Sequence, residues 1–238
     1  MTTALLEVIA LDAGDARLAV EGGADRLELV SAMEFSGFNP AVETFAQIRA
    51  AVDVPLRVML RLRDGFAAGG AAGVTALKAA ARELRAEGAD EFVIGLLDRS
   101  GAADVSALED VLAALDGSAW TFHKAIDAAA DRDAVFDAVR PLPGLDTVLT
   151  SGGPFPAGRG VEVLRAEAAR EADRPDGLSI LVGGGLTLPD LPALRAVGLA
   201  RFHVGSAVRA TGDWAGPVDP EQVAVWRSAL DEPTEAAV

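Results

Sequence analysis

Two kinds of apolar pattern alternate along the chain. Short apolar runs are typical of buried strands, and longer alanine-rich stretches with a period near 3.6 are typical of amphipathic helices. The predicted strands are Leu5–Leu11, Arg26–Ala32, Pro55–Arg61, Glu91–Asp98, Ala119–Ala125, Asp146–Ser151, Leu178–Gly183 and Arg201–Ser206. The predicted helices are Asp12–Glu21, Pro40–Val52, Val74–Glu87, Val105–Leu115, Asp133–Val139, Val161–Glu171, Leu188–Val197 and Pro220–Leu230. Strict alternation of the two elements predicts a parallel sheet.

A four-fold repeat indicates that this sheet closes. Residues Gly23–Leu29 match Gly88–Ile94, and looser copies begin at Gly144 and Gly198. In each copy we expect the glycine to end an odd-numbered helix in the left-handed conformation, just before an even-numbered strand. Four two-strand units predict an α/β fold with a closed parallel sheet, the (β/α)8 TIM barrel. A doubly wound open sheet is the alternative, and it would not naturally give four such copies.

Capping residues support several of the predicted helix starts. Asp12 and Asp104 precede apolar periodic stretches, where a carboxylate accepts hydrogen bonds from the first free amides. Pro40 and Pro220 suit the first turn of a helix, which needs no amide donor from the proline.

Length and composition fit one cytoplasmic domain. The chain has 238 residues, half of them hydrophobic, which suits a single barrel over residues 1–230 with a frayed tail over 231–238. No apolar run reaches the ~18 residues of a membrane span, and Met1–Ala10 lacks the basic start of a secretory signal. Cysteine is absent, which excludes disulfides and thiolate metal sites and is compatible with a reducing cytoplasm.

The charge balance limits the choice of partner. Acidic residues outnumber basic ones 36 to 21, and the net charge is −15. Phosphate backbones and anionic membranes bind clustered lysine and arginine, so we expect neither nucleic acid nor a membrane as a partner. A metal ion or a small anionic metabolite in a local basic pocket remains compatible with this composition.

Ionisable residues interrupt several predicted strands, where a barrel interior is normally apolar. Such groups need partners or a wet pocket, because an isolated buried charge is unfavourable. One interpretation is an internal ion network in which Glu7 and Glu28 face Arg57 or Arg61. The other is a polar pocket at the carboxyl ends of the strands, lined also by the chain's two histidines, His123 and His203. In that pocket the candidates for proton transfer are Glu7, Glu28, Asp98 and His123.

Two of the strand ends allow alternative roles. Asp98 is suited to accept a proton, to pair with Arg61 or to cap the following turn. Lys124 is suited to form a Schiff base if burial lowers its pKa, or to form an ion pair with Asp127. The sequence does not separate these roles.

Small residues follow the last three predicted strands, and in barrels the loops after strands seven and eight commonly bind phosphate. Free backbone amides and arginine forks both stabilise an anion. The anion-binding candidates are Arg61, Arg63, Lys124, Ser151, Gly152, Gly183, Gly184, Gly205 and Ser206. The flexible stretch Gly65–Gly73 is a candidate lid, and Trp214 a candidate for closing the other side.

The chain resembles the copper homeostasis protein CutC family over almost its whole length. The resemblance rests on five segments in matching order and spacing, which are Leu6–Val8, Gly23–Leu29, Leu96–Asp98, Thr121–Asp127 and Val148–Gly152. It implies a cytoplasmic (β/α)8 barrel, a homo-oligomer and a part in copper homeostasis, with copper as the bound ion.

Three features depart from the family pattern. The cysteines proposed as copper ligands in some members are absent, which leaves His123 and His203 as metal ligands beside Met33 and Met59. Two imidazoles with carboxylates suit Cu(II) or Zn(II) better than Cu(I). The family more often reads Arg-Pro-Arg near Arg61, followed by a Gly/Asp/aromatic stretch, and usually has arginine in place of Lys124.

Three functions therefore stay open. The first is copper binding, and the second is an enzyme that performs acid–base chemistry on a small anionic or phosphorylated metabolite. The third is a non-catalytic binding scaffold, for which we expect a blocked pocket beside a large apolar patch on the exterior.

Overall fold

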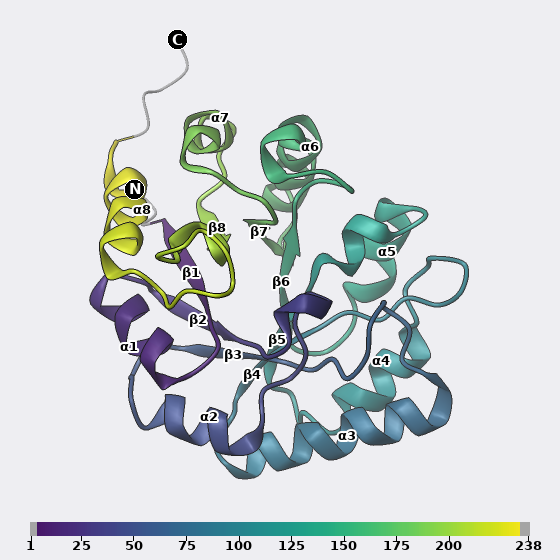
Figure 1. Cartoon of the computed structure of the whole chain (residues 1–238). Helices are drawn as coiled ribbons and strands as arrows, with labels where there is room; N and C mark the ends of the chain where they lie inside the picture. Colours follow the sequence, from purple (N-terminus) through teal and green to yellow (C-terminus); the bar gives the residue numbers. More distant parts are fainter. Residues whose placement is uncertain (1–3, 234–238) are drawn as a thin grey trace.

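The computed structural model describes residues 4–233 and shows eight parallel strands closed into a barrel in sequence order (Figure 1). The strands are β1 (Leu5–Ala10), β2 (Arg26–Leu29), β3 (Leu56–Met59), β4 (Glu91–Ile94), β5 (Ala119–Phe122), β6 (Leu145–Thr150), β7 (Ser179–Gly183) and β8 (Arg201–Val204). Because β1 pairs with both β2 and β8, the sheet is closed, which confirms the predicted barrel and excludes the open sheet.

Eight α-helices surround the strands. They are α1 (Ala13–Glu21), α2 (Val42–Arg49), α3 (Gly70–Ala86), α4 (Val105–Leu112), α5 (Arg132–Val139), α6 (Val161–Ala172), α7 (Leu191–Ala196) and α8 (Pro220–Asp231). Short 3₁₀ turns also follow strands, namely η1 (Met33–Phe35), η2 (Lys124–Ala128), η3 (Ala157–Arg159), η4 (Leu188–Asp190) and η5 (Ser206–Val208). The main hydrophobic core lies between strands and helices and includes fully buried Trp120, Phe92 and Trp226.

The helix starts agree with the capping residues at three of four positions. Asp12 accepts hydrogen bonds from the amides of Gly14 and Asp15, and Asp104 caps α4. Pro220 occupies the first turn of α8. The prediction for Pro40 is wrong, because α2 begins at Val42 and Pro40 precedes its N-cap.

The repeated glycines end helices in three of the four copies. Gly23, Gly88 and Gly198 have φ angles of +99°, +99° and +89° and directly follow the C-cap residues of α1, α3 and α7. Gly144 also has a positive φ of +82°, but Pro141–Pro143 separates it from the end of α5. A side chain at Gly144 would overlap the carbonyl oxygen of Ser118, so this glycine allows close packing before β6 and does not end a helix.

The Gly65–Gly73 stretch is only partly a loop. Helix α3 begins at Gly70, so the predicted start at Val74 is too late and the second half of the candidate lid is helical. Gly73 permits this start, because a Cβ atom there would overlap the carbonyl oxygen of Ala68.

Only part of the predicted C-terminal tail lies within the described residues. Of the tail predicted over 231–238, Asp231 closes α8, and residues 234–238 lie outside the described residues, as do residues 1–3. Among the described helices, none combines the length and apolar character that a membrane crossing requires.

An ion network centred on the buried side chain of Arg57 lies at the amino end of the barrel. Arg57 donates through Nε to Glu91 at 2.8 Å, through Nη1 to Thr121 at 2.6 Å, and through both terminal nitrogens to Asp146 at 2.6–2.8 Å. The side chain of Arg57 is only 3% exposed, so these bonds replace the water it would otherwise hold. The internal network expected from the sequence is present here, but its acidic partners are neither Glu7 nor Glu28.

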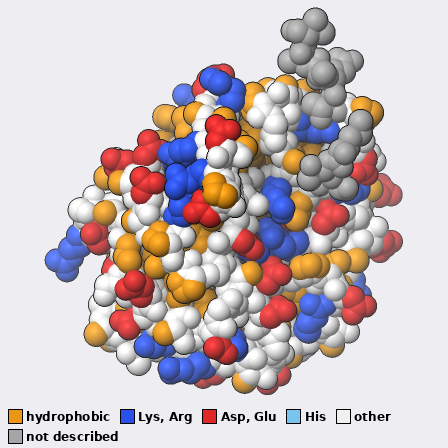
Figure 2. All heavy atoms as spheres, turned by 180° about the vertical axis from the view of Figure 1, so that it is seen from behind, with side chains coloured by type: hydrophobic (Ala, Val, Ile, Leu, Met, Phe, Trp, Pro, Cys, Tyr) orange, Lys and Arg blue, Asp and Glu red, His pale blue; other side chains and the backbone are white. Residues whose placement is uncertain are grey.

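Ion pairs also join neighbouring elements on the outside of the barrel. Arg140 forms paired hydrogen bonds with Glu171 of α6, and Arg132 binds Glu167 of the same helix. Basic and acidic side chains lie interspersed on the face seen in Figure 2, rather than forming one continuous basic stripe.

Replacing Arg57 with methionine tests the network at the amino end. We expect Arg57→Met to lower the free energy of unfolding by about 1–2 kcal/mol, because buried Thr121 loses a donor while Glu91 and Asp146, which are 28% and 47% exposed, regain water. Urea unfolding followed by circular dichroism measures the change. The matched control is Arg165→Met, which removes a pair exposed at 54% and 81% and should change stability by less than about 0.5 kcal/mol. Equal effects of the two substitutions would contradict the role given to Arg57.

Candidate functional site

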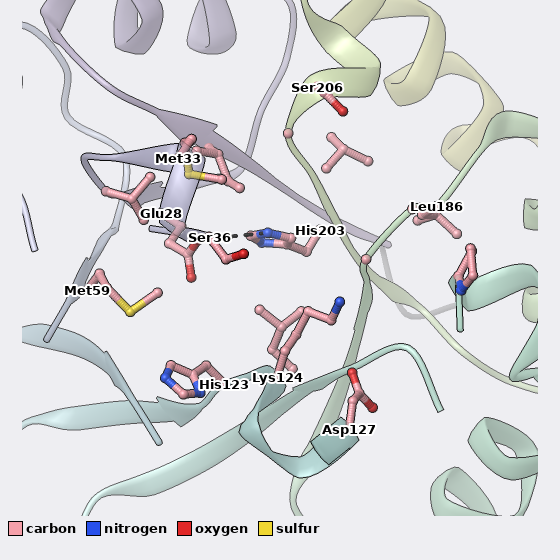
Figure 3. Close-up of a pocket in the computed structure, with 18 of the residues that line it drawn as sticks. Glu28, Met33, Ser36, Met59, His123, Lys124, Asp127, Leu186, His203 and Ser206 are labelled. Carbon is pink, nitrogen blue, oxygen red and sulfur yellow. Dashed lines mark ion pairs between the residues drawn. The ribbon is translucent and has the colours of Figure 1, made fainter. Parts of the chain in front are cut away.

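A cavity of about 650 Å³ opens at the carboxyl ends of the strands (Figure 3). Its wall combines strand residues with residues from the loops after β2, β3, β5, β6, β7 and β8. Side chains do not block it, so the marker expected for a non-catalytic scaffold is missing from the described part of the chain. Eight of the predicted site residues line this cavity: Glu28, Arg61, His123, Lys124, Gly184, His203, Gly205 and Ser206. Six do not: Glu7, Arg63, Asp98, Ser151, Gly152 and Gly183.

Strand register brings four ionisable residues into one chain of contacts. Glu7 lies beside His203 of β8 and beside Arg26 of β2, and Glu28 follows on the same face of β2. Glu7 accepts a hydrogen bond from Arg26 Nε at 2.5 Å and contacts His203 Nδ1 at 2.8 Å. His203 Nε2 then lies 3.8 Å from a carboxylate oxygen of Glu28. Sequence reasoning missed Arg26, although it lies inside the repeated glycine motif.

This chain of contacts gives the carboxyl groups of Glu7 and Glu28 different pKa values. Burial alone would raise the pKa of Glu7, but the Arg26 charge and the bond to His203 bring it down to about 2. Burial and the nearby Glu7 charge instead raise the pKa of Glu28 to about 7. Burial disfavours the charged ring of His203, yet the carboxylates of Glu28 and Glu7 outweigh it and raise its pKa. Near neutral pH, Glu7 is therefore ionised and Glu28 exchanges a proton, and the raised pKa of His203 favours its protonated ring.

His123 faces the same cavity in the opposite protonation state. Burial, assisted by the charges of Arg61 and Lys124, lowers the pKa of His123 to about 3. Its Nδ1 accepts a hydrogen bond from the backbone amide of Ala125 at 3.1 Å, so the proton of the neutral ring lies on Nε2. Gly95 leaves room for this ring, because a Cβ atom there would overlap the imidazole.

Two buried polar atoms of the cavity wall lack partners. Within residues 4–233, neither His123 Nε2 nor Glu28 Oε1 has a hydrogen-bonding partner. Buried polar groups are almost always hydrogen-bonded in native proteins. A donor on His123 and a protonatable oxygen on Glu28 that both line one cavity are therefore suited to a bound ligand.

Arg61 holds a loop in place and has little capacity left for an anion. Its Nη1 donates to the carbonyl oxygens of Phe35 at 2.6 Å and Gly37 at 2.8 Å, and its Nε donates to Gly65 at 3.1 Å. Its Nη2 donates to Asp64 at 3.3 Å. Arg61 therefore fastens the turn after β2 over the cavity, and it does not pair with Asp98.

Lys124 contributes a cation without a partner. It begins η2 after β5, and its amine lies against Gly184, where a side chain would overlap it. The expected ion pair with Asp127 is wrong. In residues 4–233 no carboxylate lies within ion-pair distance of the Lys124 amine.

Asp127 instead organises the loop after β6. Its two carboxylate oxygens accept hydrogen bonds from Thr150 Oγ1 at 2.6 Å, from the amide and hydroxyl of Ser151 at 2.9–3.0 Å, and from the Gly153 amide at 3.1 Å. Arg132 Nη1 neutralises it at 2.9 Å. These bonds shape the cavity wall, and they place Ser151 beneath it. The motif around Lys124 contained Asp127, but its partners far along the chain were invisible in the sequence.

Asp98 and Arg63 lie away from the cavity. Asp98 is exposed and accepts hydrogen bonds from the amide and hydroxyl of Ser100 at 2.6–2.8 Å, which lower its pKa. Of its three proposed roles, the structure shows the turn cap. Arg63 is likewise exposed on the outer side of the loop after β3.

Backbone amides and an indole complete the wall at β7 and β8. Among the described residues, the amides of Gly184, Gly205 and Ser206 donate to no protein acceptor. Trp214 covers Gly205, where a Cβ atom would overlap the indole. Trp214 also lines the cavity, with Arg209 5.0 Å from its ring centre, so the indole borders the cavity as predicted.

The two histidines provide a direct test of this electrostatic arrangement. Because the pKa of His123 is lowered to about 3, we expect its ring to stay neutral from pH 8 to pH 4 with the proton on Nε2. Because the pKa of His203 is raised, we expect that ring to keep its proton above pH 6.5. Long-range ¹⁵N NMR of the imidazoles measures both states, and His203→Gln assigns the signals. Titration of both rings near pH 6.5 would contradict the arrangement.

Comparison with known proteins identifies the family. The CutC family model matches residues 4–208. The chain is 35% identical over 202 residues to the family protein CutC of Xanthomonas campestris pv. campestris strain B100, covering 84% of this chain and 82% of that protein. It is 30% identical over 200 residues to the family protein CutC of Klebsiella pneumoniae strain 342, covering 84% and 79%.

Solved structures agree at the level of the fold. The crystal structure of the putative copper homeostasis protein CutC from Streptococcus agalactiae superimposes with a TM-score of 0.77 at 22% identity, covering 85% of this chain and 98% of that one. Thiamine phosphate pyrophosphorylase from Pyrococcus furiosus superimposes with a TM-score of 0.59 at 16% identity, covering 96% of each chain. These two likenesses concern the barrel alone, whereas the sequence matches show that the chain belongs to the CutC family.

Proposed function

We propose that this CutC-family protein is an enzyme that moves a proton next to the carbonyl group of a small anionic metabolite. The supporting observation is that Glu28 Oε1 and His123 Nε2, both buried and without partners among the described residues, line one cavity. One is a group that exchanges a proton near neutral pH, and the other is a hydrogen-bond donor. Proton abstraction beside a carbonyl requires both.

Glu28 is the general base of the proposed reaction. A base is most effective when its pKa lies close to the working pH, and burial brings the pKa of Glu28 to about 7. Its carboxylate takes the proton from the carbon beside the carbonyl group, and the electron pair of that C–H bond moves toward the carbonyl oxygen. His203 contacts Glu7 and lies 3.8 Å from Glu28, and its raised pKa favours a positive charge beside the base.

His123 stabilises the oxygen that becomes negative. A neutral imidazole with its proton on Nε2 donates a hydrogen bond to that oxygen without transferring the proton. The Ala125 amide fixes this tautomer, so the donor is oriented before the substrate binds. Return of a proton from Glu28 to the same carbon, as the electron pair moves back from the oxygen, restores the carbonyl group and completes an exchange reaction.

The anionic group of the substrate belongs at the β7 and β8 end of the cavity. The Lys124 amine and the free amides of Gly184, Gly205 and Ser206 supply positive potential there. Barrel enzymes commonly bind phosphate after these two strands. Arg61 has no part in this proposal, because its donors are committed to the turn after β2.

Copper binding is the alternative that the family name suggests. Among the described residues, the acidic and histidine side chains that bring ligand atoms within 4.8 Å of one another in a group of three are Glu7, Glu28 and His203. His123 is not in this group, and its Nδ1 accepts from an amide, so a metal on Nε2 would force two N–H groups together. His203 lies between the carboxylates of Glu28 and Glu7, which raise its pKa and so favour the protonated ring over a metal-bound one, and Arg26 already neutralises Glu7. With no cysteine in the chain, these residues do not fit a copper site.

Solvent exchange tests the proposed reaction without knowledge of the natural substrate. The protein is incubated in D₂O with dihydroxyacetone phosphate, ribulose 5-phosphate, pyruvate and phenylpyruvate, and NMR follows loss of the proton beside each carbonyl group. We expect exchange of at least one compound, with a rate that rises as the pH passes about 7 because Glu28 must be ionised.

Three variants assign that exchange to the site. Glu28→Gln should lower the rate by at least about 100-fold, and His123→Gln by about 100-fold. Glu83→Gln on the exposed face of α3 is the matched control and should leave the rate unchanged. Equal rates in the protein and in Glu28→Gln would contradict the role of Glu28, and no exchange of any compound would contradict the proposal.

Copper titration tests the alternative. Because no suitable ligand set is assembled, we expect isothermal titration with Cu(II), and with Cu(I) under anaerobic conditions, to show no saturable site at micromolar concentrations. The double variant His123→Ala/His203→Ala should behave like the unaltered protein. One equivalent of retained copper that is lost in the double variant would instead support the copper function.

A further inference from the structure

The cavity has an apolar part that proton transfer does not explain. Ile9, Val30, Met59 and Val93 form a buried hydrophobic cluster, separate from the main core between strands and helices. Met33 and Trp214 pack against it from the loops after β2 and β8. All of these except Val93 line the cavity. This cluster, the inner apolar wall, therefore faces the same space as Glu28 and His123.

Met33 and Met59 of the inner apolar wall lie on another side of the cavity from the Lys124 amine and Gly184, whereas Ile9 and Trp214 of the same wall border Gly205. Figure 3 shows Met33 and Met59 on the side of β2 and β3, and Ser206 and Leu186 on the other side. Glu28 and His203 lie between them. The strand order supports this separation for Met59 and Gly184, because β3 lies across the closed barrel from β7. A ligand that reaches both ends must be anionic at one end and apolar at the other.

The size of the cavity points to the same kind of ligand. A volume of about 650 Å³ lies within the range of pockets that enclose drug-sized molecules, roughly 300–1,000 Å³. A phosphate ion or a three-carbon acid would leave most of the inner apolar wall against water. Thioether side chains adapt to the shape of a bound group and make favourable contacts with aromatic rings, and Trp214 offers an indole face.

We propose that the ligand of this cavity is an anion that carries an aromatic ring, with its anionic group at Lys124, Gly184 and Ser206 and its ring against Met33, Met59 and Trp214. This inference rests on the proposed function for the position of the anionic group. It adds the substrate class, which is an aryl-substituted anion rather than a small sugar phosphate.

Binding of three simple probes tests the inference. Phenyl phosphate carries both parts, inorganic phosphate carries only the anion, and phenol carries only the ring. Trp214 reports binding by its fluorescence, because Trp120 and Trp226 are 0–1% exposed in the core. We expect phenyl phosphate to bind at least about tenfold more tightly than inorganic phosphate, because the ring removes apolar surface from water.

Two variants separate the ends of the ligand. Met33→Gln should bring the affinity for phenyl phosphate to within about threefold of that for inorganic phosphate, because it places an amide in the apolar wall. Lys124→Gln should weaken phenyl phosphate and inorganic phosphate alike, by about tenfold. Leu62→Gln, at an exposed position on the loop after β3, is the matched control and should change neither affinity.

The outcomes distinguish this inference from the proposal on which it rests. One outcome would rule out only the aromatic class. In it, phenyl phosphate and inorganic phosphate bind with equal affinity, Lys124→Gln lowers both affinities, and Met33→Gln changes neither, so the anion site stands. If phenol binds as tightly as phenyl phosphate and Lys124→Gln has no effect, the anion site fails together with the inference. Isothermal titration with the same probes checks that the fluorescence change reports binding and not a local change at Trp214.

Discussion

The contacts of Glu7 connect the closure of the barrel to the chemistry of its cavity. This carboxylate lies where the first and last strands meet, with Arg26 of β2 on one side and His203 of β8 on the other. Arg26 lowers the pKa of Glu7 and so keeps it ionised inside the barrel, and the carboxylates of Glu28 and Glu7 together raise the pKa of His203. The protonation of Glu28 then depends on its two neighbours, the carboxylate of Glu7 and the imidazole of His203. Replacing Glu7 with an apolar residue would thus also change the pKa values of His203 and Glu28.

The polar residues at the two ends of the barrel differ in how completely they are bonded. At the amino end, all three guanidinium nitrogens of Arg57 have partners, so this network holds strands together and leaves no capacity for a ligand. At the carboxyl end, Glu28 and His123 each retain a buried atom without a partner among the described residues. Both ends looked alike in the sequence, as ionisable residues within apolar strands. Arg140 Nε and Glu167 Oε2 in the outer ion pairs also lack partners, so it is the combination of an unpartnered atom with a place in the cavity wall that distinguishes Glu28 and His123.

The fold was predictable because its determinants are local. Periodicity and the repeated glycine motif specify strands, helices and closure, and Asp12 and Asp104 cap their helices as their spacing predicts. The candidate site depended on long-range partners, and there prediction was weaker. Arg61 had the composition of an anion clamp, but the carbonyl oxygens that occupy it come from a turn about 25 residues earlier in the chain. Asp127 likewise has long-range partners that the sequence did not reveal. Its carboxylate accepts hydrogen bonds from Thr150 and Ser151 and does not pair with Lys124.

Because Lys124 does not pair with Asp127, its amine is available to the cavity. With Asp127 committed to the loop after β6, the amine faces the cavity as a cation without a partner in residues 4–233. Its charge lowers the pKa of His123 from one side, while the committed guanidinium of Arg61 does so more strongly from another. Burial is the main cause that keeps His123 neutral and the two cations add to it, and a neutral ring with its proton on Nε2 is what a developing oxyanion requires. An anion bound at Lys124 would reduce this effect, so ligand binding and the protonation of His123 are coupled by the geometry of the cavity itself.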